Sequence, residues 1–213
     1  MKAIRIIQLL CCLSVLAILQ TACRGEIPIM HTEEEWITPS YAGSPIKGLF
    51  LLNEGNMGSN KASIDFFDYT TGKYNRNIYP SRNPSIVKEL GDVGNDIAIY
   101  GSKLYAVINC SHYVEVMDVH TAEHIGSIDI LNCRNIIFNN GKAYVSSYAG
   151  PVQIDPDARP GKVVEIDTTD LSSTREVVVG YQPEEMVITD GKLYVANSGG
   201  FRYSNYDRNA SVV

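Results

Sequence analysis

Residues suited to binding a small molecule gather in four polar stretches of the chain. In three of them an asparagine, Asn53, Asn109 or Asn197, comes directly after an apolar run rich in β-branched and aromatic residues. An amide in that place can bind a ligand, or it can close the end of a strand by hydrogen bonding to the backbone. The other candidates in or beside these stretches are Glu54, Asn56, His112, Tyr148, Phe201, Arg202 and Tyr203.

The last polar stretch places two rings and a guanidinium group together, at residues 201–203. Aromatic rings and arginine stack well on planar or sugar-like ligands, which indicates noncovalent binding. The alternative is that these side chains only cover an edge of the fold. The sequence leaves both readings open.

The sequence contains no motif for covalent or metal-assisted catalysis: it lacks a nucleophile elbow, an HExxH pair, a Walker loop and a Rossmann fingerprint. Asn95–Asp96 and Glu184–Glu185 could supply oxygen ligands to a divalent metal, but Asn135 breaks the series of carboxylates. We therefore predict a non-catalytic protein with no catalytic residue, no metal site and no cofactor. A metal-dependent hydrolase or lactonase is the alternative.

The cysteines divide by position. Cys11 and Cys12 lie in an apolar run at the N-terminus and Cys23 ends that region, which leaves Cys110 and Cys133 as an even pair. In an oxidising compartment the pair is a candidate disulfide, and two buried free thiols are the alternative. Neither a CxxC pair nor clustered histidines accompany them, so they do not predict a metal site.

A repeated pattern of short apolar runs would position these residues. "IYGSKLYAVINCS", "FNNGKAYVSSYAG" and "ITDGKLYVANSGG" each place a glycine, at 101, 141 and 191, between two such runs. Asn140-Gly141 and Asp190-Gly191 favour a two-residue hairpin of type I′, because both central residues tolerate a positive φ, and Gly101-Ser102 suits type II′. Each unit therefore contains at least one antiparallel hairpin.

A second marker recurs with almost the same spacing. "IDFFD", "VEVMD" and "VVEID" end at Asp68, Asp118 and Asp167, and threonine follows each aspartate within three residues. Such an aspartate can accept hydrogen bonds from the backbone just after it and so make a tight turn. This marker predicts a third strand, a turn and a fourth strand in each unit.

Units of four short antiparallel strands, repeated every 40 to 50 residues, predict an all-β fold, the β-propeller. The expected inner strands cover 97–100, 135–138 and 186–189, and the second strands cover 104–108, 143–146 and 193–196. The expected blades cover 48–90, 95–130, 134–179 and an incomplete 184–213. This amounts to about three and a half blades, and since propellers close with roughly four to eight, we expect the N-terminal part of a longer, seven-bladed protein.

The N-terminus has the composition of an export signal. Lys2 and Arg5 precede an apolar run too short for a membrane span, which needs about 20 apolar residues. The run ends at "LQTAC", which resembles the lipobox of bacterial lipoproteins and implies that Cys23 is acylated and becomes the new N-terminus. We expect residues 1–22 to be a lipoprotein signal peptide and residues 23–47, with three prolines and three successive glutamates, to be a tether.

The charge of the chain excludes one class of partner. The whole sequence carries a net charge of −6, and residues 1–22 remove Lys2 and Arg5 but no acid, so 16 basic residues face 24 acidic ones, a net charge of −8. Such a surface repels nucleic acid and anionic lipid headgroups. We therefore predict no nucleic-acid partner.

Three sequence stretches carry a resemblance to known proteins. "GKLYVANS" and "KVVEIDTTD" resemble the YVTN-type propeller repeat. "GLFLLNEGNMGSNKASIDFFDYTTG" is similar to the surface lipoprotein propellers of Gram-negative gut bacteria, and the likeness runs from about Gly48 to the end. Some of those lipoproteins capture cobalamin and pass it to an outer-membrane transporter. The resemblance implies an exported lipoprotein of the outer membrane or cell surface.

Together these observations predict a non-catalytic, lipid-anchored propeller. Its long loops would bind a small nutrient such as a corrinoid, with cobalamin as a bound ligand and not a cofactor, or a partner protein such as an outer-membrane transporter. A structural interaction propeller within a surface complex is a further alternative.

Overall fold

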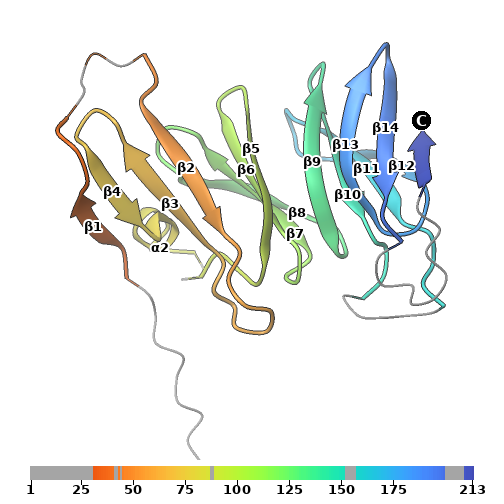
Figure 1. The fold of residues 1–213 in the computed structure, drawn as a ribbon, viewed down its shortest axis with the longest axis horizontal. Coiled ribbons are helices and arrows are strands. Elements are labelled where there is room, and N and C mark those ends of the chain that lie inside the picture. Colours follow the sequence, from red (N-terminus) through yellow and green to blue (C-terminus); the bar gives the residue numbers. More distant parts are fainter. Residues whose placement is uncertain (1–30, 41–42, 44, 87–88, 152–156, 200–208) are drawn as a thin grey trace, which may run out of the picture.

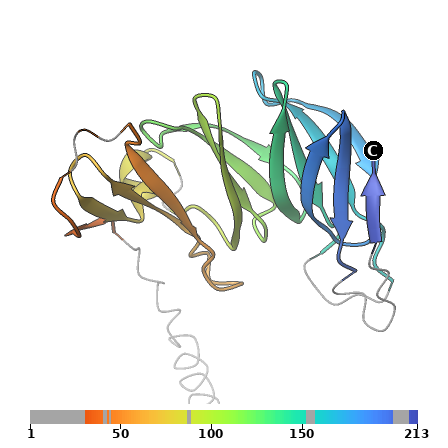
Figure 2. The ribbon, with the colours of Figure 1, turned by 45° about the horizontal axis from the view of Figure 1, so that its top comes forward.

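The computed structural model describes residues 31–40, 43, 45–86, 89–151, 157–199 and 209–213. It consists of four antiparallel sheets that follow one another like the vanes of a fan, which confirms the all-β, incomplete propeller (Figures 1 and 2). The inner strands β5 (Gly94–Tyr100), β9 (Cys133–Asn139) and β13 (Pro183–Thr189) lie side by side, and β2 (Gly48–Asn53) of the first sheet lies beside β5. Within the described ranges, no helix has the length and apolar character needed to cross a membrane.

The second and third blades have the predicted order of four strands. In each, the chain runs from the inner strand outward, giving the orders β5-β6-β7-β8 and β9-β10-β11-β12. Their remaining strands are β6 (Lys103–Ile108), β7 (Tyr113–Asp118), β8 (His124–Asp129), β10 (Lys142–Ser147), β11 (Lys162–Asp167) and β12 (Ser173–Val178). The predicted inner and second strands lie within the observed ones, which extend them by one to three residues.

The fourth blade shows three strands in the described residues. β14 (Lys192–Asn197) pairs with β13 on one side and with β15 (Asn209–Val212) on the other. "ASVV", predicted as the third strand of this blade, falls on β15 and the residue after it.

The first blade differs from the other three. Its order is β1-β4-β3-β2, with β1 (Glu33–Trp36), β3 (Ser63–Asp68) and β4 (Lys73–Arg76). Backbone hydrogen bonds identify β2 as a second strand, because Tyr69 N donates to Lys47 O as Val119 N donates to Ser102 O in the next blade. Among the described residues, this blade therefore has no counterpart of β5, β9 and β13.

The tether prediction is wrong for residues 33–36. They form β1, which pairs with β4 through Glu33↔Arg76 to Trp36↔Lys73. Lys73 Nζ lies 2.7 Å from a Glu34 oxygen and Arg76 Nη2 lies 2.6 Å from a Glu35 oxygen. The run of glutamates that suggested a solvated tether is thus matched by basic side chains on the neighbouring strand.

The turns have the predicted chemistry. Asn140 and Gly141 have φ values of 48° and 79°, and Asp190 and Gly191 have 50° and 71°, as type I′ requires. Asp68 Oδ1 accepts hydrogen bonds from the Thr70 N–H and hydroxyl at 2.8 and 2.6 Å. Asp118 and Asp167 accept backbone N–H groups in the same way.

The core lies between the blades because each middle sheet is apolar on both faces. Between the second and third blades, the Tyr100 and Phe138 rings stack with centroids 4.8 Å apart and planes 5° apart. Buried side chains around them include Val107, Val116, Val145, Val164 and Ile166. A second cluster joins the first and second blades around Ile64, Leu90, Leu104 and Met117. Each blade thus depends on its neighbour for burial.

Candidate functional site

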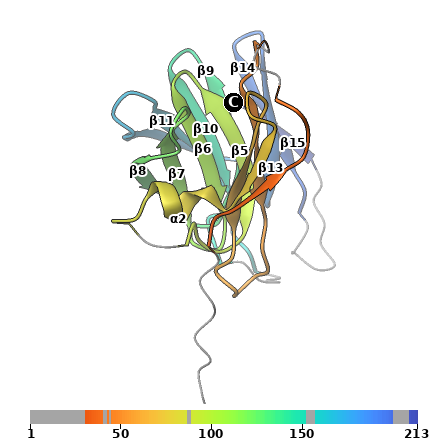
Figure 3. The same cartoon turned by 90° about the vertical axis from the view of Figure 1, so that its left-hand side faces the viewer.

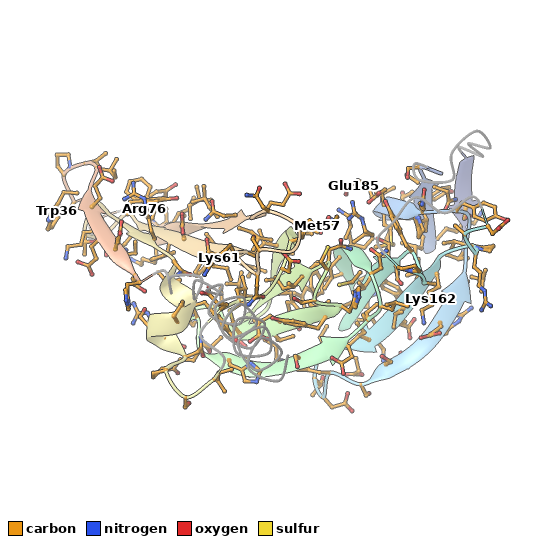
Figure 4. The ribbon with its side chains drawn as sticks, turned by 90° about the horizontal axis from the view of Figure 1, so that it is seen from below. Trp36, Met57, Lys61, Arg76, Lys162 and Glu185 are labelled. Atoms are coloured by element: carbon orange, nitrogen blue, oxygen red, sulfur yellow. The ribbon has the colours of Figure 1, made fainter. Side chains whose placement is uncertain are left out.

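The predicted site residues that the structure describes lie on one face of the fan. The tight hairpins after β5, β9 and β13 point to one side, whereas β2, β6, β10 and β14 end on the other, the lower side in Figure 1. Figure 4 looks onto this second side, and it labels Met57 and Lys61 in the loop after β2 and Glu185 near the start of β13. We call it the long-loop face.

The three recurring asparagines form hydrogen bonds at strand ends, Asn109 to the backbone as the structural alternative expects, and Asn53 and Asn197 to serine hydroxyls. Asn53 Nδ2 donates to Ser63 Oγ at 3.1 Å, and Asn197 Nδ2 donates to Ser211 Oγ at 2.9 Å. Asn109 is buried, and its Nδ2 donates to Cys133 O at 2.8 Å. These amides join the second strand of a blade to an adjacent segment.

Hydrogen bonds from backbone N–H groups to side chains also hold the first two loops. The loop after β2 wraps around Asp92, whose carboxylate accepts the N–H of Gly58 at 2.7 Å and that of Asn60 at 3.3 Å. Glu54 and Asn56 are exposed within this loop. His112 has a φ of 64°, and its Nδ1 accepts the Asn132 N–H at 3.1 Å. Its ring therefore braces the loop.

Tyr148 is a predicted site residue whose ring and hydroxyl are both held by charged side chains. The Arg134 guanidinium lies over its ring, 4.9 Å from the centroid, and Arg134 Nε donates to Glu184 at 2.9 Å. The Tyr148 hydroxyl donates to the same carboxylate. Burial, followed by the hydrogen bond and the charge of Glu184, raises the pKa of Tyr148. The ring is thus fixed in place and its hydroxyl stays protonated.

β-Bulges near the starts of the inner strands, which no sequence pattern predicted, place Arg134 and Glu184 together. The register of each inner strand shifts near its start, between Gly94 and Asp96 and at the matching points of β9 and β13. A β-bulge of this kind re-aims side chains. The residue just before each strand adopts a positive φ; these residues are Val93, Asn132 and Gln182.

The bulged residues link one blade to the next. Asn95 Nδ2 donates to Arg134 O at 2.7 Å, and Asn135 Nδ2 donates to Glu185 Oε1 at 3.0 Å. Asp96 Oδ2 accepts the N–H of Ile136 at 2.8 Å. The carboxylates and amides noticed in the sequence are therefore brought together, largely as blade-to-blade contacts. Asn95, Arg134 and Glu184 occupy equivalent positions near the starts of β5, β9 and β13. Of these three residues, Arg134 was not singled out from the sequence.

A cavity opens beside Tyr148 on the long-loop face. It has a volume of about 300 Å³. Leu131, Tyr148 and Pro151 line it, together with the exposed Arg159. The Leu131 side chain is 45% exposed although it is large and apolar. An apolar wall, a fixed ring and a guanidinium group suit noncovalent binding of a small molecule.

The candidate disulfide is not formed in the structure, which holds both cysteines as free thiols. Cys133 is buried, and its Sγ lies 3.4 Å from Tyr113 O and 3.6 Å from Ile108 O, so the thiol is directed at backbone carbonyls. Cys110 is half-buried, with its Sγ 3.5 Å from Asn109 Oδ1. The alternative of two thiols describes the structure.

Four predicted residues lie outside the described part of the chain: Cys23, Phe201, Arg202 and Tyr203. Within that part, no group of three or more histidine, cysteine, aspartate or glutamate side chains could hold a metal ion.

The sequence comparison identifies the family. Residues 47–203 match the family model described as "Domain of unknown function (DUF5074)", so the chain belongs to that family. Among curated proteins, none matches the chain.

The structural comparison supports the propeller fold. Kuenenia stuttgartiensis hydrazine synthase is 18% identical over 78% of this chain and 42% of its own, with a TM-score of 0.56. The chain therefore spans less than half the length of that protein. Two others are a computationally designed protein, Ika4, at 11% identity over 71% and 78% of the two chains with a TM-score of 0.49, and BamB from Moraxella catarrhalis, at 15% over 64% and 38% with a TM-score of 0.45.

Proposed function

We propose that this protein is a non-catalytic, lipid-anchored β-propeller that captures a small nutrient at the cavity beside Tyr148. The observation that carries the proposal is the combination of that cavity with a ring fixed by Arg134 and Glu184. A preorganised aromatic wall loses little conformational entropy when a ligand stacks on it. A corrinoid such as cobalamin is the first ligand to test, because the chain from about Gly48 onward resembles surface lipoprotein propellers, some of which capture cobalamin.

The side chains beside the cavity favour binding over catalysis. Glu184 accepts hydrogen bonds on both oxygens, Oε2 from Arg134 Nε at 2.9 Å and Oε1 from Arg134 Nη2 at 3.4 Å and from the Tyr148 hydroxyl. A carboxylate neutralised in this way is poorly placed to take a proton from a substrate. Arg159, which lines the cavity together with the acidic Asp157, has no ion pair in the described part of the chain and could pair with an anionic group of a ligand.

The cavity is small for a whole corrinoid. Its volume of about 300 Å³ stands at the lower end of the range for small-molecule pockets. Such a ligand would place one edge in the cavity and lie over the loops around it. A smaller planar nutrient would fit entirely.

The proposed location is the outer membrane or cell surface, through a lipid on Cys23 and with an outer-membrane transporter as the receiving partner. Its support is the signal-like N-terminus and the "LQTAC" sequence. Labelling of cells with a fatty-acid analogue should mark the protein. Cys23→Ser should abolish the label and remove the protein from the membrane fraction. A labelled Cys23→Ser protein would contradict the anchor.

The binding test uses the full chain purified in detergent, titrated with cobalamin by calorimetry. We expect one site, and Leu131→Ala should weaken binding by about tenfold, because burying a leucine side chain contributes roughly 1.5–3 kcal/mol and 1.4 kcal/mol is a factor of ten. Ile125→Ala is the matched control, since Ile125 is 46% exposed, as Leu131 is 45%, but lies outside the cavity on β8. Its affinity should equal that of the unmodified protein.

The same sample separates the alternatives. Its divalent-metal content is measured along with the titration. Stoichiometric metal without cobalamin binding would overturn the proposal in favour of the metal-dependent hydrolase. Absence of both, with unchanged folding, would favour the structural interaction propeller.

A further inference from the structure

A second site is indicated by a buried carboxylate in the second blade. Glu115, on β7, is 2% exposed. Its Oε1 accepts the Tyr79 hydroxyl at 3.0 Å and lies 2.6 Å from His124 Nδ1. In the part of the chain that the structure describes, Oε2 accepts no hydrogen bond. One oxygen of a buried carboxylate is therefore doubly used while the other is unused.

In the first blade, the equivalent buried carboxylate accepts a hydrogen bond on each of its two oxygens. Asp65 precedes Asp68 by three residues, as Glu115 precedes Asp118, and it is also buried, with 6% exposed. Asp65 Oδ2 accepts the Tyr74 hydroxyl at 2.7 Å, and Oδ1 accepts the Asn77 N–H at 2.8 Å. The acid at this repeat position is structural in the first blade, whereas Glu115 keeps one oxygen available.

Glu115 lines a cavity of about 340 Å³ between α2 (Ile78–Arg82) and the second blade. Figure 3 shows α2 beside β7 and β8, and Tyr79 of α2 contributes to the cavity wall. Tyr113 forms another part of the wall, and the exposed Asp129 lies at the rim.

The described residues that line this cavity include more acidic than basic side chains. The carboxylates of Glu89, Glu115 and Asp129 line it, together with His124, whose Nδ1 contacts Glu115 Oε1 and not Oε2, and no lysine or arginine of the described residues does. Glu89 is neutralised by Lys61 at 2.6 Å, but Asp129 has no ion pair within the described ranges. Burial raises the pKa of Glu115, although the His124 contact and the Tyr79 hydroxyl oppose that shift. A bound cation would offset the cost of burying this carboxylate.

We propose that the cavity binds a small organic ammonium ion, with Glu115 Oε2 as acceptor of an N–H hydrogen bond. Charge-assisted bonds of this kind are among the strongest in proteins. The Tyr79 and Tyr113 rings supply an aromatic wall on which an ammonium ion and its carbon substituent pack favourably. An ammonium ion suits the site better than a metal, because no group of three ligating side chains exists in the described residues.

This site is independent of the nutrient cavity, since the two share no lining residue. The test is calorimetry of the full chain with benzylammonium chloride at about pH 8, above the ordinary titration range of imidazole. We expect one saturable site, with no heat from benzoate, which has a ring of the same size and the opposite charge.

Three variants distinguish a binding role from a structural one. Glu115→Gln keeps the size of the side chain and should weaken benzylammonium binding at least tenfold. Asp129→Asn, at the exposed rim, should weaken it about two- to fivefold by lowering the negative potential. Asp65→Asn alters the matching acid of the first blade and should leave affinity unchanged. Melting temperatures are measured for all three.

The outcomes are decisive. Equal affinity in Glu115→Gln, or no ammonium binding by the unmodified protein, would overturn the proposal. Saturable binding of calcium chloride in place of benzylammonium would also overturn it and assign a metal site. Should Glu115→Gln fail to fold, the rim variant Asp129→Asn still decides, because an unchanged affinity there would contradict a cation site.

Discussion

Arg134 lies over the ring of Tyr148, with its guanidinium carbon 4.9 Å from the ring centroid, and both side chains bond Glu184 of the next blade. The contact crosses a blade boundary on the long-loop face. It therefore serves two purposes, since it couples the third blade to the fourth and fixes the aromatic wall of the candidate nutrient cavity. Both depend on the bulges at the starts of β9 and β13.

The attachment of β1 can be tested at Gly72. This glycine has a φ of 74°, and an added Cβ would lie 1.9 Å from Thr38 O. Gly72→Ala should therefore cost about 1–2 kcal/mol for the left-handed conformation and a further amount for displacing residues 37–39. Urea unfolding measures the loss, and limited proteolysis should show earlier cleavage near β1.

Gly141→Ala is the matched control for Gly72→Ala. Gly141 has a φ of 79°, but an added Cβ would meet no atom within 4 Å. Its cost should be that of the backbone conformation alone. Equal losses in the two variants would contradict the close packing of β1 on the first blade.

The hydroxyl of Tyr105 should contribute nothing to stability. Tyr105 is fully buried between the second and third blades, and its hydroxyl has no hydrogen-bond partner among the residues that the structure describes. An unsatisfied buried hydroxyl costs about 1–3 kcal/mol, so Tyr105→Phe should leave the melting temperature unchanged or raise it. Tyr79→Phe is the contrast, because it removes the bond to Glu115 and should lower the melting temperature. A clear loss in Tyr105→Phe would reveal a partner for the hydroxyl.

Asp167 should make stability depend on pH in the acid range. The Thr169 N–H and then Lys142 lower the pKa of Asp167 to about 2. The folded pKa lies below the ordinary value of about 3.9, so this stabilisation is present above about pH 4 and is lost as the pH falls toward 2.

Asp167→Asn checks this sign. Relative to the unmodified protein, its urea midpoint should be lower at neutral pH, and the difference should shrink near the folded pKa of about 2. Asp129→Asn serves as control, since the Asp129 carboxylate makes no ion pair in the described residues. A difference for Asp167→Asn that is constant with pH would show that the carboxylate charge is not responsible.

The strands and turns could be predicted from sequence because their signals are local. The alternation of apolar residues predicts β6, and Asn140-Gly141 predicts the hairpin that follows β9. β1 was missed because its stability comes from long-range partners. Glu34 and Glu35 contact Lys73 and Arg76, about 40 positions later in the sequence, only once β1 is paired with β4.

The candidate site could be predicted only in part for a similar reason. Tyr148 was found because it follows a recognisable second strand. Arg134 was not, because no local pattern marks a β-bulge that turns a side chain toward the next blade. The recurring asparagines were correctly located, but their role depends on partners such as Ser63 and Cys133 that only the fold brings near.

The thiols provide the last prediction. Burial raises the pKa of the Cys133 thiol to about 12 and also raises that of the less buried Cys110. The reactive form is the thiolate, so native protein treated with N-ethylmaleimide at about pH 8 should be modified slowly at Cys110 and not at Cys133. Unfolding in urea without a reductant should expose both cysteines to modification. Because a disulfide survives urea and blocks both sulfurs, peptide mass spectrometry that finds both unmodified until a reductant is added would restore the disulfide and refute the free thiols.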